Sequence, residues 1–178
     1  LTSMGDGKIY PYDQVTNKIG EAMPNTAGTT SICGLSWSED GKAAYIVNMF
    51  NPTDPLEPGY VAKIEWPSGN LISKIANVTK PSPEGKPLSH QSARTPDGKY
   101  LYVADGFDGT LVKIDLTTDK IVKSIAMGTG EPHSLVISAD GKTAYIAVRG
   151  APDKNQSSIF IMDMAKEEIT GTIPGITA

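Results

Sequence analysis

The stretch Pro96-Asp97-Gly98-Lys99-Tyr100-Leu101-Tyr102-Val103-Ala104 specifies the architecture of this chain. It joins a turn tripeptide, Asp-Gly-Lys, to an alternating run of apolar β-forming residues. Asp-Gly before such a run is a strong hairpin signal, because glycine accepts a positive φ and aspartate tolerates one. The tripeptide recurs, and each copy has a tyrosine five residues after its aspartate. The copies pair Asp40 with Tyr45, Asp97 with Tyr102 and Asp140 with Tyr145.

A second pattern alternates with the first. It consists of an acidic residue, an apolar residue six positions later and another apolar residue four positions beyond that. Polar turn-forming residues fill the gap after the acid, and alternating strands such as residues 111–114 precede it. The pattern predicts a second hairpin. Its copies are Asp13/Ile19/Met23, Glu65/Leu71/Ile75, Asp115/Ile121/Ile125 and Asp163/Ile169/Ile173.

Together the two hairpins give a repeat of four strands, called a, b, c and d. In the clearest copy we expect them at residues 91–95, 100–104, 110–115 and 120–126. Four short strands repeated every 40–50 residues or so are typical of a propeller blade. The predicted fold class is therefore all-β, a β-propeller with four-stranded antiparallel blades. A β-sandwich or barrel is the alternative, although its strands need not repeat in fours.

The same residues resemble a known family. Residues 96–104, together with Gly109–Asp115 and Ile121–Ile125, are similar to the YVTN repeat. Residues 130–135 resemble that family's link into the next blade. The resemblance covers nearly the whole chain and implies a propeller, but such propellers serve many purposes and it does not assign a function.

Strand counting predicts about three and a half blades in a single segment of 178 residues. A half blade of strands c and d occupies 1–29, and blades follow at 30–80, 81–127 and 128–178. The last strand is expected to end at Ile173. Because propellers usually close with four to eight blades, we expect the missing blades to come from the rest of a longer chain or from another subunit.

The lengths of the connections distinguish the two faces of the propeller. The a–b and c–d turns are short, whereas the b–c and d–a connections are expected to be long, as at 48–59, 77–89 and 149–157. Since strands alternate in direction, the long connections emerge on one side, here called the long-loop face. Long loops on a rigid scaffold usually carry binding residues. We therefore expect a protein or surface partner to bind through the b–c and d–a loops.

Four residues are candidate ligand-binding residues, and no catalytic residue is assigned. His90 and His133 each lie seven positions before an Asp-Gly-Lys aspartate, and Cys33 is the equivalent residue of the other blade. On the innermost strand they would line the channel mouth, where imidazole and thiol groups suit a metal or haem pocket. The other interpretation is that each histidine bonds to a neighbouring blade's backbone. Arg94 and Arg149 are candidate anion ligands, or solvated or ion-paired arginines; the metal and the cofactor stay open.

Composition excludes several classes of function. The net charge of −4 without a basic cluster disfavours nucleic acid as a partner. No apolar run approaches the 18 or so residues that a membrane span needs. Covalent c-type haem, a closed Cys/His zinc site and a phosphate-binding P-loop all lack their residues. Two sequons, at Asn77 and Asn155, weakly favour an extracytoplasmic location, the periplasm or cell surface.

Two functions remain open. The first is an extracytoplasmic scaffold that binds a protein, glycan or surface partner through its long-loop face. The second, implied by the resemblance, is the propeller portion of an enzyme with a site at the channel mouth. Such an enzyme would be a redox protein associated with haem, copper or a quinone subunit, or a lactonase-like hydrolase. Whether the protein is an enzyme is left open.

Overall fold

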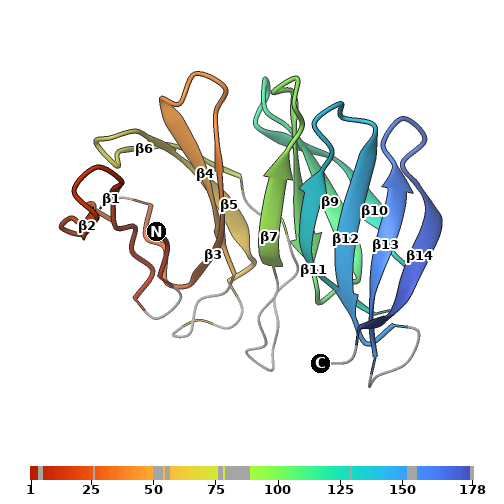
Figure 1. The fold of residues 1–178 in the computed structure, drawn as a ribbon. Coiled ribbons are helices and arrows are strands. Elements are labelled where there is room, and N and C mark those ends of the chain that lie inside the picture. The colour runs from red at the N-terminus through yellow and green to blue at the C-terminus, as the bar shows by residue number, and fades with distance from the viewer. Residues whose placement is uncertain are drawn as a thin grey trace.

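The computed structural model describes residues 1–3, 6–25, 27–49, 54, 57–75, 78, 89–128, 130–151 and 156–176. These residues form an all-β structure of three four-stranded antiparallel sheets and a two-stranded hairpin (Figure 1). The hairpin pairs β1 (Tyr12–Asp13) with β2 (Lys18–Ile19). Blade 1 is β3 (Ile32–Trp37), β4 (Ala43–Asn48), β5 (Tyr60–Glu65) and β6 (Leu71–Ile75). Blade 2 is β7 (Ser89–Arg94), β8 (Tyr100–Asp105), β9 (Thr110–Asp115) and β10 (Lys120–Ala126). Blade 3 is β11 (Glu131–Ile137), β12 (Thr143–Arg149), β13 (Ser157–Asp163) and β14 (Glu168–Ile176).

The Asp-Gly-Lys turns close the first hairpin of every blade by the same set of bonds. In blade 2, Thr95 Oγ1 donates to Asp97 Oδ1 at 2.7 Å, and the Lys99 amide donates to the same oxygen at 3.1 Å. Gly98 has a φ of 73°, in the left-handed region that glycine adopts without strain. The equivalent serine–aspartate bonds are 2.7 Å in blade 1 and 2.6 Å in blade 3. The predicted a–b hairpins are therefore confirmed.

The second hairpin explains the recurring acid. Asp115 Oδ1 accepts the backbone amides of Thr117 and Thr118 at 2.8 and 3.3 Å, which fixes the turn before β10. Asp13 and Asp163 bond in the same way to the amides two and three residues ahead. The fourth residue after each acid has a positive φ, and these residues are Asn17, Gly69, Asp119 and Glu167. The acids of this pattern are thus turn residues, as the repeat indicated.

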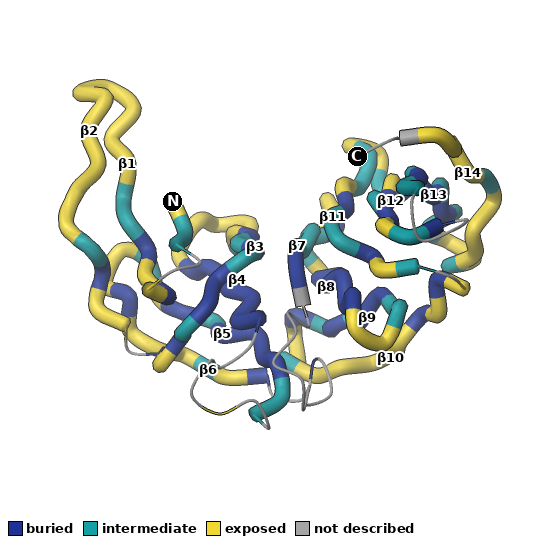
Figure 2. Tube along the Cα trace, turned by 90° about the horizontal axis from the view of Figure 1, so that it is seen from below, coloured by how far each residue is buried: buried dark blue, intermediate teal, exposed yellow. Residues whose placement is uncertain are grey.

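The sheets fan around the first strand of each blade. Figure 2 shows β3, β7 and β11 on the inside of the arc and β6, β10 and β14 on the outside. Polar contacts join β3 to β7: the hydroxyls of Ser36 and Ser92 lie 3.0 Å apart, and Gln91 Nε2 donates to the Cys33 carbonyl at 3.3 Å. A Cβ on Gly34 would lie 2.9 Å from the His90 carbonyl oxygen. Glycine at this position therefore allows the inner strands to approach closely.

Apolar side chains fill the space between successive sheets. One layer lies between the N-terminal segment and blade 1, a second between blades 1 and 2, and a third between blades 2 and 3. The sheets of blades 1 and 2 thus bury residues on alternate positions of both faces, as parts of two different layers. The layer between blades 1 and 2 consists of Tyr45, Val47, Val61, Ile75, Val78, Leu101, Val103, Val112, Ile114 and Leu116.

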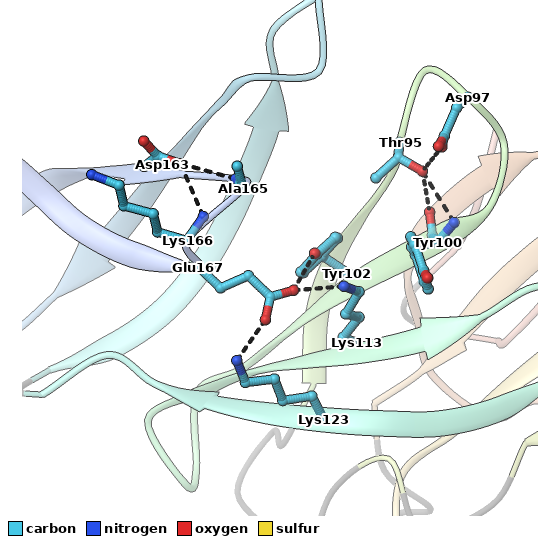
Figure 3. Close-up of polar contacts among 10 residues, drawn as sticks. All are labelled: Thr95, Asp97, Tyr100, Tyr102, Lys113, Lys123, Asp163, Ala165, Lys166 and Glu167. Atoms are coloured by element: carbon cyan, nitrogen blue, oxygen red, sulfur yellow. Dashed lines mark hydrogen bonds and ion pairs between the residues drawn. The ribbon is translucent and has the colours of Figure 1, made fainter.

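Ion pairs join the third strand of one blade to the second hairpin turn of the next blade at equivalent positions. Lys63 Nζ on β5 lies 3.4 Å from Asp119 Oδ2, which comes from the second hairpin turn of blade 2. Lys113 Nζ on β9 lies 2.6 Å from Glu167 Oε1, from the same turn of blade 3 (Figure 3). In both cases the left-handed turn residue places its carboxylate against the preceding blade.

Glu167 has the larger set of partners. Its Oε1 also accepts the Tyr102 hydroxyl at 2.9 Å, and its Oε2 lies 2.6 Å from Lys123 Nζ (Figure 3). Burial alone would raise the pKa of Glu167, but the bonds from Lys113, Lys123 and Tyr102 outweigh it and lower the pKa to about 2. The carboxylate is therefore charged over the whole range in which the protein is expected to be folded.

The structure extends two predicted boundaries. At the N-terminus, Tyr10 N donates to the Leu1 carbonyl at 2.8 Å and Ser3 N to the Lys8 carbonyl at 2.9 Å. Residues 1–3 therefore lie antiparallel beside residues 8–10, in addition to the expected c–d pair. At the other end β14 continues to Ile176, beyond the predicted end at Ile173. The proposed division into blades at 30, 81 and 128 stays a prediction.

None of the described residues belongs to a helix that could cross a membrane. Parts of the long connections, including residues 81–87 and most of residues 52–58, and both sequon asparagines lie outside the described residues.

The Glu167 cluster gives a first prediction. Glu167→Gln leaves the Lys113 ammonium without its carboxylate between two sheets and should lower the free energy of unfolding at pH 7 by about 2–3 kcal/mol. Because the folded pKa of Glu167 is about 2 and its ordinary value is 4.5, this contribution is present above pH 4.5 and is lost as the pH falls towards 2.

Urea unfolding at several pH values measures this effect. The exposed neighbour Glu168 provides the control, since Glu168→Gln should change the stability by less than about 0.5 kcal/mol. If the two substitutions lowered the free energy of unfolding equally at pH 7, or if the loss in Glu167→Gln persisted at pH 2, the stabilising role of the Glu167 carboxylate would be contradicted.

Candidate functional site

His90 and His133 form the centre of the candidate site. They lie near the starts of β7 and β11, the adjacent inner strands, at the long-loop face. Their rings stack with centroids 4.3 Å apart and an angle of 25° between the planes. His90 is only 4% exposed. The structure thus brings together the two histidines that the repeat spacing placed at equivalent positions.

A bulge near the start of each inner strand positions these side chains. The pairing of β11 with β12 shifts between Pro132 and Ser134, so that His133 is the extra residue. The same kind of shift surrounds His90 in blade 2 and Cys33 in blade 1. A β-bulge re-aims a side chain that regular alternation would direct elsewhere, and bulges are frequent near functional sites. The recurring bulge therefore gives these equivalent residues a direction that regular alternation would not give them.

Gly106 lies in the b–c turn of blade 2 and leaves room for the His90 ring beside that turn. A Cβ at Gly106 would lie 3.0 Å from both Cδ2 and Nε2 of His90 and 3.3 Å from the Pro132 carbonyl oxygen. Only a residue without a side chain leaves this space to the imidazole. The position of the His90 ring therefore depends on a glycine in the turn above it.

Burial keeps both imidazoles neutral. Burial is the main cause that lowers the pKa of His90 to about 4, and the positive charges of His133 and Arg149 lower it further. Burial and Arg149 also lower the pKa of His133, against the opposing effect of Glu131. At pH 7 the stack thus consists of two uncharged rings, which avoids the repulsion between two imidazolium ions.

The stacked geometry does not suit a shared metal ion. Imidazole nitrogen lone pairs lie in the ring plane, so rings stacked face to face direct them within nearly parallel planes that are separated by the stacking distance. A metal bound by both would need the nitrogens to converge on one point about 2.0–2.1 Å away. Within the described part of the chain, no group of three or more His, Cys, Asp or Glu side chains could hold a metal. The pair could hold a metal only if the rings turned apart.

Cys33 and Arg94, the other inner-strand candidates, are not part of the ring stack. Cys33 is half-buried on β3, where burial raises the pKa of its thiol, so the thiol is protonated at pH 7. Arg94 ends β7, four residues and therefore about 13 Å beyond His90. Its Nη1 is buried against the Asp-Gly-Lys turn, 2.7 Å from the position of a Cβ on Gly98. Arg94 thus belongs to the short-turn end of the channel.

Arg149 lies on the long-loop face, beside the histidines. It is the last residue of β12 and pairs with Glu131, the first residue of β11. Its Nη2 lies 3.1 Å from Glu131 Oε2. Both side chains are more than half exposed, so the ion pair contributes little stability and each group can turn towards a ligand.

A hollow of about 720 Å³ opens beside this ion pair. It lies where the connections of the long-loop face are shortest, because only four residues separate β8 from β9 and four separate β10 from β11. The other connections there have seven to thirteen residues. The expectation that the b–c and d–a connections are long and variable is therefore wrong in length for these two connections, and the short loops leave the space open. The lining residues are Gly106, Phe107, Asp108, Gly109, Gly128, Gly130, Glu131, Arg149 and Gly150.

Phe107, Glu131 and Gly106 are the site residues that the sequence reasoning missed. Phe107 is 44% exposed in the hollow, although a phenylalanine usually avoids water. The available signal was the four-residue segment Gly106–Gly109, which places an aromatic residue among glycines between two clear strands. Exposed aromatic residues on such loops are more typical of binding sites than of packing.

The histidine pair gives a second prediction. Unfolded histidine binds a proton near pH 6.5 but buried His90 does so only near pH 4, so stability should fall as the pH drops through this window. The expected loss is on the order of 3 kcal/mol. His90→Gln should be less stable at pH 7 but should lose less stability between pH 7 and pH 4.

Urea unfolding at pH 7, 5.5 and 4 gives this difference. His133→Gln is the control, and most of the wild-type loss should remain in it because His90 is the more deeply buried ring. The same pH dependence in wild type and His90→Gln would show that His90 is not the titrating group.

Comparisons with known proteins agree with this fold. No family model matches the chain. The uncharacterised protein YncE from Salmonella typhi is 26% identical over 164 residues, which cover 88% of this chain and 40% of YncE. YncE from Salmonella typhimurium matches with the same identity and coverage.

Among solved structures, hydrazine synthase of Kuenenia stuttgartiensis superposes with a TM-score of 0.74. The match is 19% identical and covers 98% of this chain and 48% of that one, so it concerns the fold alone. The chain spans less than half the length of each of these proteins. It is a distant homologue of YncE with the fold of part of a larger propeller-containing structure.

Proposed function

We propose that this chain is part of an extracytoplasmic β-propeller scaffold that binds a ligand or partner at the hollow on its long-loop face. The observation that carries the proposal is the combination of exposed Phe107 with the Glu131–Arg149 ion pair around one open space. An aromatic ring with one or two polar groups that fix orientation is the usual composition of a binding site. The neutral histidine stack lies next to Gly106 and supports this wall of the hollow.

The chemistry of the hollow suits a ligand with an apolar ring and a charged group. Phe107 offers a ring face or edge for stacking. Arg149 can bind a carboxylate or phosphate, and Glu131 can bind a cation. In each case the charged group of the ligand replaces the other member of the exposed ion pair. Bare glycine backbone at the rim adds amide and carbonyl groups that a side chain would otherwise cover.

A redox or hydrolytic role of the complete protein is the second candidate, and the histidine pair at the channel mouth is the observation in its favour. Its stacked geometry requires a rearrangement before a metal could bind both rings. Absorption spectra and metal analysis of the full-length protein, purified from its own host, test this role. A stoichiometric chromophore or transition metal that His90→Ala and His133→Ala remove would replace the scaffold proposal with an enzyme.

Small probes test the binding site directly. We expect phenylacetate, benzylammonium and benzyl alcohol to shift the backbone NMR signals of Gly106, Phe107 and Gly109 at millimolar concentration. Phe107→Ala should weaken all three probes by about fivefold or more, because each loses its aromatic contact. Arg149→Gln should weaken phenylacetate selectively, since only this probe presents an anion to the guanidinium group.

Tyr12→Ala is the matched control, because Tyr12 is 45% exposed and lies on the distant β1–β2 hairpin. It should leave the three affinities unchanged. Signals that shift only at the short-turn end of the channel, near Trp37 and Arg94, would overturn the location of the site. Fractionation of the host cells tests the extracytoplasmic location, which a purely cytoplasmic protein would disprove.

A further inference from the structure

A cavity of about 500 Å³ opens between blades 2 and 3 at the short-turn end, on the face opposite the hollow. It is here called the interblade cavity. Strands β8 and β9 and the Asp-Gly-Lys turn of blade 2 form one wall, and both hairpin turns of blade 3 form the other. Figure 3 shows the turn at Asp163 on one side, the turn at Asp97 on the other and Tyr102 between them. No described residue lines both this cavity and the hollow, so the two sites are separate.

The interface between blades 1 and 2 is packed more tightly at the equivalent place. Its Ala43 and Leu116 correspond in the repeat to Tyr100 and Met164, and they are only 7% and 9% exposed. Tyr100 and Met164 are half-buried and line the interblade cavity. The repeat therefore permits a closed interface at this place, and the opening is a particular property of blades 2 and 3.

One difference within the repeat accounts for part of this opening. Glu39 precedes the aspartate of the first Asp-Gly-Lys turn, and a Cβ on Gly98 of blade 2 would lie 3.0 Å from Glu39 Oε2. Pro96 stands in the same place in the next repeat, and its Cδ would lie 3.5 Å from a Cβ on Gly141 of blade 3. The compact proline ring thus leaves space beside the turn of blade 3, where a glutamate comes closer in the preceding interface.

The sides of the interblade cavity are apolar or aromatic, and polar contacts fix its floor. Pro96, Tyr100 and Met164 contribute the sides. At the floor, Lys113 Nζ lies 4.0 Å from the centroid of the Tyr100 ring and 2.6 Å from Glu167 Oε1. These contacts hold Lys113 and Tyr100 in place without a ligand, so the cavity is preformed. Its volume lies in the range of about 300–1,000 Å³ that is typical of small-molecule sites.

Three aspartates place acceptor oxygens at the edge of the cavity. Asp97, Asp140 and Asp163 each use Oδ1 for hydrogen bonds within their own turn. A carboxylate has two acceptor oxygens, so Oδ2 of each can still accept from a ligand. Lys142 lines the same cavity and supplies ammonium donors. The edge therefore presents acceptors and donors together.

This mixture of charges disfavours a strongly charged ligand. A cation would approach Lys142 and Lys113 as well as the aspartates, and an anion would meet three carboxylates. A hydroxyl group both donates and accepts, so it can bond to a carboxylate oxygen and to an ammonium group at once. Hydrogen bonds to such charged partners are also the stronger ones. A compact ring that carries several hydroxyls with C–H surface between them suits both the edge and the apolar sides.

We propose that the interblade cavity binds a neutral sugar ring. Its hydroxyls donate to Oδ2 of Asp140 and Asp163 and accept from Lys142, while its C–H surface packs against Tyr100 and Met164. This site is additional to the hollow on the long-loop face and uses none of the residues of the hollow. Either site can therefore fail its test without affecting the other.

Methyl NMR of the full-length protein with isotope-labelled methionine tests the site. At least one of methyl β-glucoside, methyl β-galactoside, methyl α-mannoside and methyl N-acetyl-β-glucosaminide should shift the Met164 signal saturably at millimolar concentration. Met127 is the internal control and should not respond, because it packs in the same core layer but bonds to Gly109 at the long-loop face. A Met164 signal that no sugar shifts at millimolar concentration, or a response of Met127 alone, would overturn the proposal.

Asp140→Asn tests the hydrogen bonds to the sugar. The amide keeps an acceptor oxygen for the turn but loses the charge, so the affinity should fall about fivefold. Asp40→Asn is the matched control and should leave the affinity unchanged, because Asp40 makes the same turn bonds in blade 1 and does not line the cavity. Equal affinities of the two variants would contradict the role of Asp140. Tighter binding of n-butylammonium or acetate than of every sugar would show that the proposed ligand class is wrong.

Discussion

A β-sheet with two apolar faces must be covered on both sides, and this requirement organises the whole structure. Alternate residues of one strand enter different core layers, as when Leu101 packs against blade 1 while Tyr102 packs against blade 3. Successive sheets therefore stack in a fan, with their first strands inside. The burial of Tyr102 between blades 2 and 3 expresses this requirement.

Polar contacts give this apolar stacking a defined geometry. On the inside, Ser36 bonds Ser92, and Gly34 permits the close approach of β3 to β7. Towards the outside, the left-handed turn residues Asp119 and Glu167 reach lysines of the preceding blade. Apolar contacts alone are non-directional. The inner and outer bonds restrict how far one blade can slide or rotate on the next.

The candidate site is formed by bulges and connections rather than by the regular strands of the repeat. Bulges near the starts of the inner strands position His90 and His133, which stack as neutral rings. The shortest connections leave the hollow beside them open, with Phe107 and Arg149 at its edge. The rigid blades thus hold a small set of loop and strand-end residues in fixed positions, as binding sites on such scaffolds require.

The sequence alone was sufficient for the hairpins, the strand positions and the equivalence of His90 with His133, because a turn and an alternating strand depend on residues only a few positions apart. In blade 2 the predicted strand bounds lie within two residues of the observed bounds. Contacts between blades join residues such as Tyr102 and Glu167, 65 positions apart, and they depend on how the sheets rotate about one another. The histidine stack, the separation of Arg94 from it and the hollow at Phe107 follow from that rotation and from local bulges. No short-range spacing encodes them, so they emerged only from the folded chain.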